Sequence, residues 1–121
     1  IEPSNDAALL QAGIASASMQ NVSQAEHFFS LSVRGAKPSK EAFLNYAAFK
    51  EERKEYKEAL SLLDQHDKHF GKSMDSMLAA ARVNDKMGNS GQAVRHYREL
   101  VNSGFRIPPD LSKFIQERIA H

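Results

Sequence analysis

The hydrophobic positions of the chain follow a helical spacing in several stretches. Three stretches place a large residue and two small ones at i, i+3 and i+4, on one stripe of a helix. They are Leu9/Ala12/Gly13, Phe43/Tyr46/Ala47 and Met77/Ala80/Ala81. After each of them comes an i, i+4 pair of an alanine and a large residue, namely Ala25/Phe29, Ala59/Leu63 and Ala93/Tyr97. The pattern predicts three pairs of helices, in which the small residues let the partners approach closely.

The three pairs share one period. Ala25, Ala59 and Ala93 are 34 residues apart. Two further columns keep this spacing, Leu10/Leu44/Leu78 and Gln24/Glu58/Gln92. Three positions before Gln24, Glu58 and Gln92 stand Asn21, Glu55 and Asn89. This arrangement is close to a capping box, a signal for the start of a helix. Glycine and proline or serine separate the units, so the chain is expected to consist of repeats.

A 34-residue helix–turn–helix unit of this kind resembles the tetratricopeptide repeat (TPR) family. The small eighth position of the family is matched by Gly13, Ala47 and Ala81, its alanine by Ala25, Ala59 and Ala93, and its bulky position twenty-four by Phe29, Leu63 and Tyr97. The bulky eleventh position departs from the family, because Ser16, Lys50 and Asn84 stand there. Its apolar role is expected to pass to Ala15, Phe49 and Val83.

The resemblance implies an all-α fold, a right-handed α-solenoid of seven helices in TPR units. The predicted boundaries are 1–5 for the tail of a preceding repeat or a linker, 6–39, 40–73 and 74–107 for TPR 1 to 3, and 108–121 for a C-terminal capping helix. Pro109 opens that last helix, since proline costs no hydrogen bond at a helix start. The helix is expected to cover the apolar face of Tyr97, Leu100 and Val101.

Composition narrows the class of protein. The formal net charge of +1 argues against a nucleic-acid module, and 41% apolar residues argue against a disordered chain. No apolar run reaches the roughly 20 residues of a membrane helix. There is no cysteine, which excludes disulfides and thiol catalysis. The start at Ile1 indicates a processed or excised piece, and the compartment stays unknown, with a bacterial cytoplasm or periplasm slightly favoured.

The resemblance also implies where a partner binds, because the first helices of TPR units line a concave groove. The residues expected there lie off the core stripe: Leu10, Gln11, Ile14, Glu41, Leu44, Asn45, Ala48, Asp75, Leu78 and Arg82. The three leucines either form an apolar track for a peptide or amphipathic helix or pack internally. Asn45 matches an asparagine with which the family often holds a ligand backbone. The acidic surround of Glu41, Asp75, Glu51, Glu52 and Asp85 favours a partner with Lys or Arg beside an apolar core.

Other chemistry finds little support in the sequence. The resemblance also implies that a clamp for a C-terminal carboxylate is not expected. Where members of the family with such a clamp carry cations, this sequence has Leu10, Ile14, Asp75 and Ala79. His66 and His69 are i, i+3 on one helix, but a packing role for His66 and a helix-end role are favoured over a metal site. No catalytic or nucleotide-binding motif is present. We therefore expect a non-enzymatic adaptor or scaffold without cofactor or metal, with a bacterial secretion or pilus-type assembly as one setting. The alternative is a structural module that self-associates through repeat ends or its convex face.

Overall fold

The computed structural model describes residues 6–120, and the predicted tail at 1–5 lies outside them. Within this range the chain forms seven α-helices and no strand, which confirms the predicted all-α class. The helices are α1 (Asp6–Ser18), α2 (Val22–Arg34), α3 (Lys40–Glu52), α4 (Tyr56–Phe70), α5 (Met74–Lys86), α6 (Ser90–Asn102) and α7 (Pro109–Ala120). The first residues of α1, α3 and α5 lie 34 apart, as do those of α2, α4 and α6. The 34-residue period of the sequence is therefore a period of helices.

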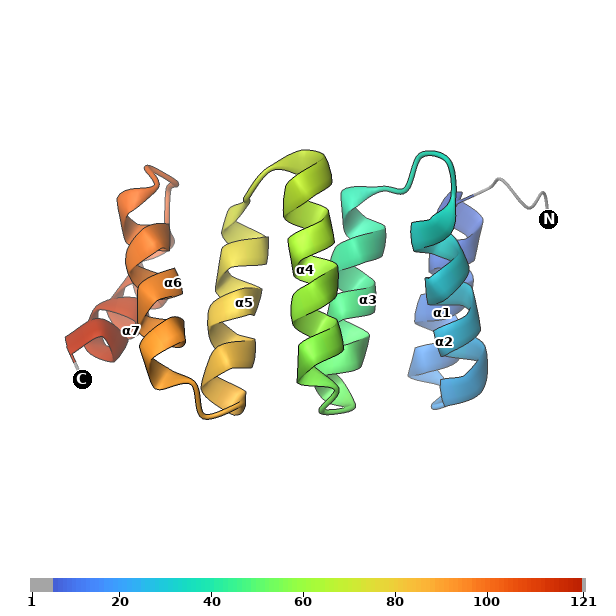
Figure 1. Cartoon of the computed structure of the whole chain (residues 1–121), viewed down its shortest axis with the longest axis horizontal. Coiled ribbons are helices and arrows are strands. Elements are labelled where there is room, and N and C mark those ends of the chain that lie inside the picture. Colours follow the sequence, from blue (N-terminus) through green and yellow to red (C-terminus); the bar gives the residue numbers. More distant parts are fainter. Residues whose placement is uncertain (1–5, 121) are drawn as a thin grey trace. The chain divides into compact units, whose positions relative to one another are not determined.

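The chain divides into two compact units, Ile1–His66 and Asp67–His121. In the first unit α1 packs against α2, and α3 contacts both of them. In the second unit α5 packs against α6, and α6 packs against α7. The consecutive helices α1 and α2 run antiparallel, and so do α5 and α6 (Figure 1). In the described residues no helix is long and apolar enough to cross a membrane.

Close approach of α1 and α2 depends on a glycine. A Cβ atom at Gly13 would lie 2.9 Å from Cδ1 of Phe29, closer than real Cβ contacts come. Phe29 is 2% exposed, and its ring centroid lies 5.6 Å from that of Tyr46 and 5.2 Å from that of Phe49. Ala25, four residues before Phe29 on α2, is fully buried. The small positions thus create space that aromatic rings fill, as the pattern predicts.

The turn after each first helix has the same backbone conformation in all three pairs. Gln20, Lys54 and Gly88, which are 34 residues apart, have positive φ angles of 61°, 64° and 83°. In each turn the next amide donates back to a carbonyl five residues earlier: Asn21 to Ser16, Glu55 to Lys50 and Asn89 to Asn84, at 2.8–2.9 Å. This is the Schellman ending of a helix, which favours glycine at the left-handed position. Only the third turn has that glycine.

The capping prediction holds in part. Asn21 accepts a hydrogen bond from the amide of Gln24 at 3.3 Å, as expected. Asn89 makes no side-chain cap bond, and the Glu55 carboxylate bonds Lys50 and Arg53 instead. A lysine and an arginine nearby offer charge-assisted bonds, which are stronger than a bond to an amide.

Polar residues occupy the eleventh position of each repeat, where the family has a bulky apolar residue, and neighbouring residues therefore fill the core. Ser16, Lys50 and Asn84 are all buried. Phe49 and Val83 take over the apolar role, at 7% and 1% exposure, as predicted. Ala15 is exposed, so the prediction for this residue is wrong. On α1 no further described helix precedes it to cover that side.

In the second unit α7 lies against the apolar face of α5 and α6. The core consists of Met77, Ala81, Ala93, Tyr97, Leu100 and Ile115. Ile115 comes from α7 and is fully buried. Arg118 of α7 also forms a bidentate ion pair with Asp85 of α5, and the Tyr97 hydroxyl donates to the same carboxylate at 3.4 Å. Both apolar and charged contacts therefore hold α7.

Candidate functional site

One face of α3 carries a stripe of four residues with a carboxylate at each end. Glu41, Asn45, Ala48 and Glu52 follow one another at i, i+4, i+7 and i+11, the spacing of a single face of a helix. The core residues of α3, such as Phe43, point elsewhere and are buried. Glu41, Ala48 and Glu52 are exposed and Asn45 is half-buried, so the stripe is accessible.

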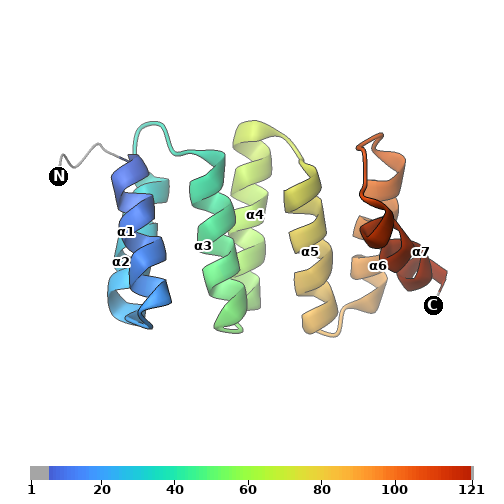
Figure 2. The ribbon, with the colours of Figure 1, turned by 180° about the vertical axis from the view of Figure 1, so that it is seen from behind.

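A pocket of about 280 Å³ opens between this stripe and α1. Its lining residues are Ile14, Ala17, Ser18, Phe29, Asn45, Ala48, Phe49 and Glu52. Figure 2 shows α1 and α3 side by side, with the α1 side of the first unit towards the viewer. The pocket is therefore lined mainly by two first helices of neighbouring pairs, with Phe29 of α2 beside them. We call it, with the stripe on α3, the α1–α3 groove.

The α1–α3 groove combines apolar and polar surface. The rings of Phe29 and Phe49 are almost completely buried, at 2% and 7% exposure, and both line the pocket. Ser18, Asn45 and Glu52 add polar groups to the lining. The side-chain nitrogen of Asn45 donates to the Glu41 carbonyl at 2.8 Å, which uses one of the several hydrogen bonds of an amide. This mixture of apolar walls and a few polar groups is typical of binding pockets.

The structure brings some of the predicted groove residues together and separates others. Ile14, Asn45 and Ala48 line the pocket. Leu10 is buried at 7% exposure, and Leu44 is half-buried. Leu78 packs against the core of the second unit, together with Leu111 and Ile119 of α7. Leu10 and Leu78 thus agree with internal packing, one of the two interpretations that the sequence allowed.

The charged surround differs from the prediction at two residues. Glu41, Glu52 and Asp75 are exposed, as an acidic surround requires. Glu51 is buried at 6% exposure, and Asp85 is bound by Arg118. Neither residue therefore presents a carboxylate to a partner, because Glu51 is buried and Asp85 is already paired with a cation.

On α5 the residues equivalent to the stripe of α3 are Asp75, Ala79, Arg82 and Lys86. Arg82 and Lys86 are exposed. On α1 the equivalent residues are Ala7, Gln11, Ile14 and Ser18, which carry no charge. Gln11 is exposed there. The acidic character is therefore a property of α3.

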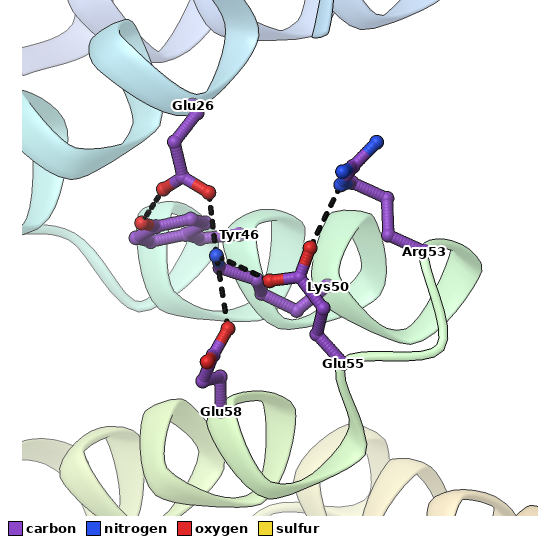
Figure 3. Close-up of polar contacts among 6 residues, drawn as sticks. All are labelled: Glu26, Tyr46, Lys50, Arg53, Glu55 and Glu58. Carbon is purple, nitrogen blue, oxygen red and sulfur yellow. Dashed lines mark hydrogen bonds and ion pairs between the residues drawn. The ribbon is translucent and has the colours of Figure 1, made fainter. Parts of the chain in front are cut away.

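A polar cluster connects α2, α3 and α4 on another side of α3. We call it the Lys50 cluster, and it consists of Glu26, Tyr46, Lys50, Arg53, Glu55 and Glu58 (Figure 3). The Lys50 ammonium group contacts Glu26, Glu55 at 2.9 Å and Glu58 at 3.1 Å. The Tyr46 hydroxyl donates to Glu26. Sequence analysis missed this cluster, although its signal was a lysine at a position that is bulky and apolar in the family.

The pKa values of the cluster favour a charged Lys50, a charged Glu55 and a neutral Tyr46. Burial, and then the hydrogen bond to Glu26, raise the pKa of Tyr46 to about 12. Burial opposes the charge of Lys50, but its bonds to Glu26, Glu55 and Glu58 outweigh this and raise its pKa. Contact with Glu58, and then the bonds from Lys50 and Arg53, lower the pKa of Glu55 to about 2. The cluster therefore keeps its ion pairs over a wide range of pH.

A second pocket of about 340 Å³ lies beside this cluster, lined by Tyr46, Lys50, Glu58, Ser61 and Leu62. The polar groups at this pocket already bond one another. For metal chemistry, no group of three His, Cys, Asp or Glu suitable for an ion occurs in residues 6–120. His66 is buried at 1% exposure, which agrees with the packing role favoured for it.

Comparison with known proteins identifies the class of fold. No family model matches the sequence, and no curated protein matches it. Among solved structures, the N-terminal domain of stress-induced protein-1 (STI-1) from C. elegans is similar, with a TM-score of 0.80. The alignment covers 96% of this chain and 95% of that one, at 18% sequence identity. The chain therefore has a TPR-like helical repeat fold.

Proposed function

We propose that the chain is a non-enzymatic protein-interaction module that holds a segment of a partner protein in the α1–α3 groove. The observation that carries the proposal is the pocket of about 280 Å³, which unites Ile14, Asn45 and Ala48 with two buried aromatic rings. Stacked helix pairs typically present extended binding surfaces of this kind. A TPR-like fold is typically an interaction module rather than an enzyme.

The size and chemistry of the groove favour one apolar side chain as an anchor. A pocket of about 280 Å³ has room for a side chain of the size of leucine or methionine, with water to spare. Burial of such a side chain contributes roughly 1.5–3 kcal/mol. Asn45 and Ser18 offer hydrogen bonds to the backbone of the segment, independently of its sequence. The secretion or pilus-type setting stays a prediction.

A photo-crosslinking amino acid in place of Ala48 tests this function, because Ala48 is exposed and lines the pocket. The control carries the same group at Gln65, an exposed position on α4. We expect crosslinks to a discrete protein at position 48 and none to that protein at position 65. The captured protein is then purified, and its Kd is measured with wild type and with Ala48→Arg.

We expect Ala48→Arg to raise the Kd of the complex at least tenfold while the helical circular dichroism stays unchanged. An arginine there fills the pocket and leaves the core untouched. Equal crosslinking at both positions would overturn the proposal, and so would an unchanged Kd for Ala48→Arg. Ala48 is a better probe than Leu44, since Leu44 is half-buried and a charge there disturbs packing.

A further inference from the structure

The two carboxylates of the α3 stripe stand apart from the other acidic groups of the first unit. Glu26, Glu55 and Glu58 are held by Lys50. Glu41 and Glu52 are exposed, and neither forms an ion pair with any residue from 6 to 120. They are therefore available for cations from outside the chain.

The surroundings of the two carboxylates supply no ion-pair partner for them among residues 6–120. The facing stripe on α1 is uncharged, as described above. Arg53, which follows Glu52, pairs with Glu55 at 2.9 Å and lies 5.9 Å from the centre of the Phe49 ring. Lys40, which precedes Glu41, is exposed at the start of α3. The stripe thus presents two separate negative ends with an apolar pocket between them.

The spacing of these ends fits an extended peptide. Glu41 and Glu52 are eleven residues apart on one helix, which corresponds to about 16 Å at about 1.5 Å per residue. An extended chain covers that distance in about five residues, at about 3.3 Å each. Ala48, at the pocket, is four residues from Glu52, or about 6 Å, which is about two residues of the peptide.

We propose that the groove selects a protein segment in which two basic residues, about five positions apart, flank one apolar residue two positions from the nearer basic residue. The inference rests on the proposed function and names the chemistry of the partner. The apolar side chain enters the pocket, and the two cations pair with Glu52 and Glu41. The Asn45 amide both donates and accepts, so the segment binds in either chain direction.

Matched synthetic peptides test this inference. Each is about twelve residues long, carries a fluorophore, and contains one Leu and two Lys in a Gly/Ser/Ala background. The Leu stays two positions from one Lys, while the separation of the two Lys varies from three to nine. Composition and net charge are identical throughout, so non-specific attraction is constant. Fluorescence anisotropy gives Kd at about 50 mM and about 500 mM NaCl.

We expect the lowest Kd at a separation of about five, roughly threefold below that at three or nine, because only the ion pair with Glu41 depends on the separation and one exposed ion pair changes Kd about threefold. High salt removes most of this difference. Glu41→Gln and Glu52→Gln each raise Kd about threefold at a separation of five. Only Glu41→Gln flattens the dependence on separation, since the Lys that pairs with Glu52 keeps its distance from the Leu in every peptide. Glu117→Gln, which removes an exposed carboxylate of α7, changes neither.

Two outcomes overturn the inference, and they are distinguishable. If Kd depends on the Leu but neither on the separation of the Lys residues nor on Glu41 and Glu52, the paired-cation chemistry is wrong and the proposed function stands. If replacement of the Leu by Ser leaves Kd unchanged and Ala48→Arg has no effect, the groove is not a binding site and both proposals fail.

Discussion

Replacement of Lys50 by methionine is expected to destabilise the protein strongly. The lysine side chain is only 10% exposed, and it is shared by Glu26, Glu55 and Glu58, whose side chains are 37%, 30% and 60% exposed. Methionine retains the apolar stem, so the change isolates the loss of the charge. Three carboxylates are then left together without their common cation.

The size of the effect follows from the burial of the groups. Removal of one partner of a fully buried ion pair costs about 3–5 kcal/mol. Here the carboxylate side chains are on average more than a third exposed and remain partly hydrated. We therefore expect a smaller loss, about 2–3 kcal/mol in the free energy of unfolding. That is a large part of the roughly 5–15 kcal/mol by which domains are stable. Lys57→Met, at an exposed position of α4, is the control and is expected to change less than about 0.5 kcal/mol.

The pH dependence gives a second readout of the same variant. The pKa of Glu55 in the folded protein, about 2, lies below its ordinary value of 4.5. Its contribution to stability is therefore complete above pH 4.5 and is lost as the pH falls towards 2. Lys50→Met lacks the part of this contribution that comes from the Lys50 bond, so its stability deficit narrows below pH 4.5. Urea unfolding of the wild type and of Lys50→Met, followed by circular dichroism at neutral and at acid pH, measures this stability deficit. A deficit below about 0.5 kcal/mol at pH 7, or one that does not change with pH, would refute the reasoning.

Three further changes have defined outcomes. Lys54→Gly removes the strain of a left-handed backbone conformation, with φ of 64°, and is expected to raise the free energy of unfolding by about 0.5–1 kcal/mol. The urea midpoint then rises with an unchanged slope, and a lower midpoint contradicts the prediction. Gly13→Ala forces a methyl group to 2.9 Å from the Phe29 ring and is expected to cost about 1–3 kcal/mol, whereas a gain would show that the ring moves freely. Arg118→Met releases Asp85 and is expected to speed hydrogen exchange of α7 amides, with α5 and α6 amides less affected; unchanged exchange in α7 contradicts it.

The helices follow closely from the sequence because their signals are local. Spacing of apolar residues at i, i+3 and i+4 fixes the face that each helix buries, and the 34-residue column of Ala25, Ala59 and Ala93 recurs as three fully buried positions. The handedness of the repeat and the predicted repeat boundaries stay predictions. Both concern how units join, which depends on contacts between distant residues.

The site follows less closely, because exposure depends on neighbouring helices. A helix pattern places Leu10 and Ala48 on similar faces, but Leu10 is buried and Ala48 is exposed. Phe29 and Phe49 were predicted for the core, yet both also line the pocket. The ion pair of Asp85 with Arg118, 33 residues later, has no local signal. Pairing of charges across helices is therefore what sequence patterns leave open.

The most direct test of the central claim is a titration of the ¹⁵N-labelled protein with the Lys-x-Leu-x-x-Lys peptide, followed by two-dimensional NMR. The account predicts that the largest amide shifts fall on Ile14, Asn45 and Ala48, and that they disappear in Ala48→Arg. If the largest shifts fall instead on α7 or on the exposed face of α4, the α1–α3 groove is not where this protein holds its partner.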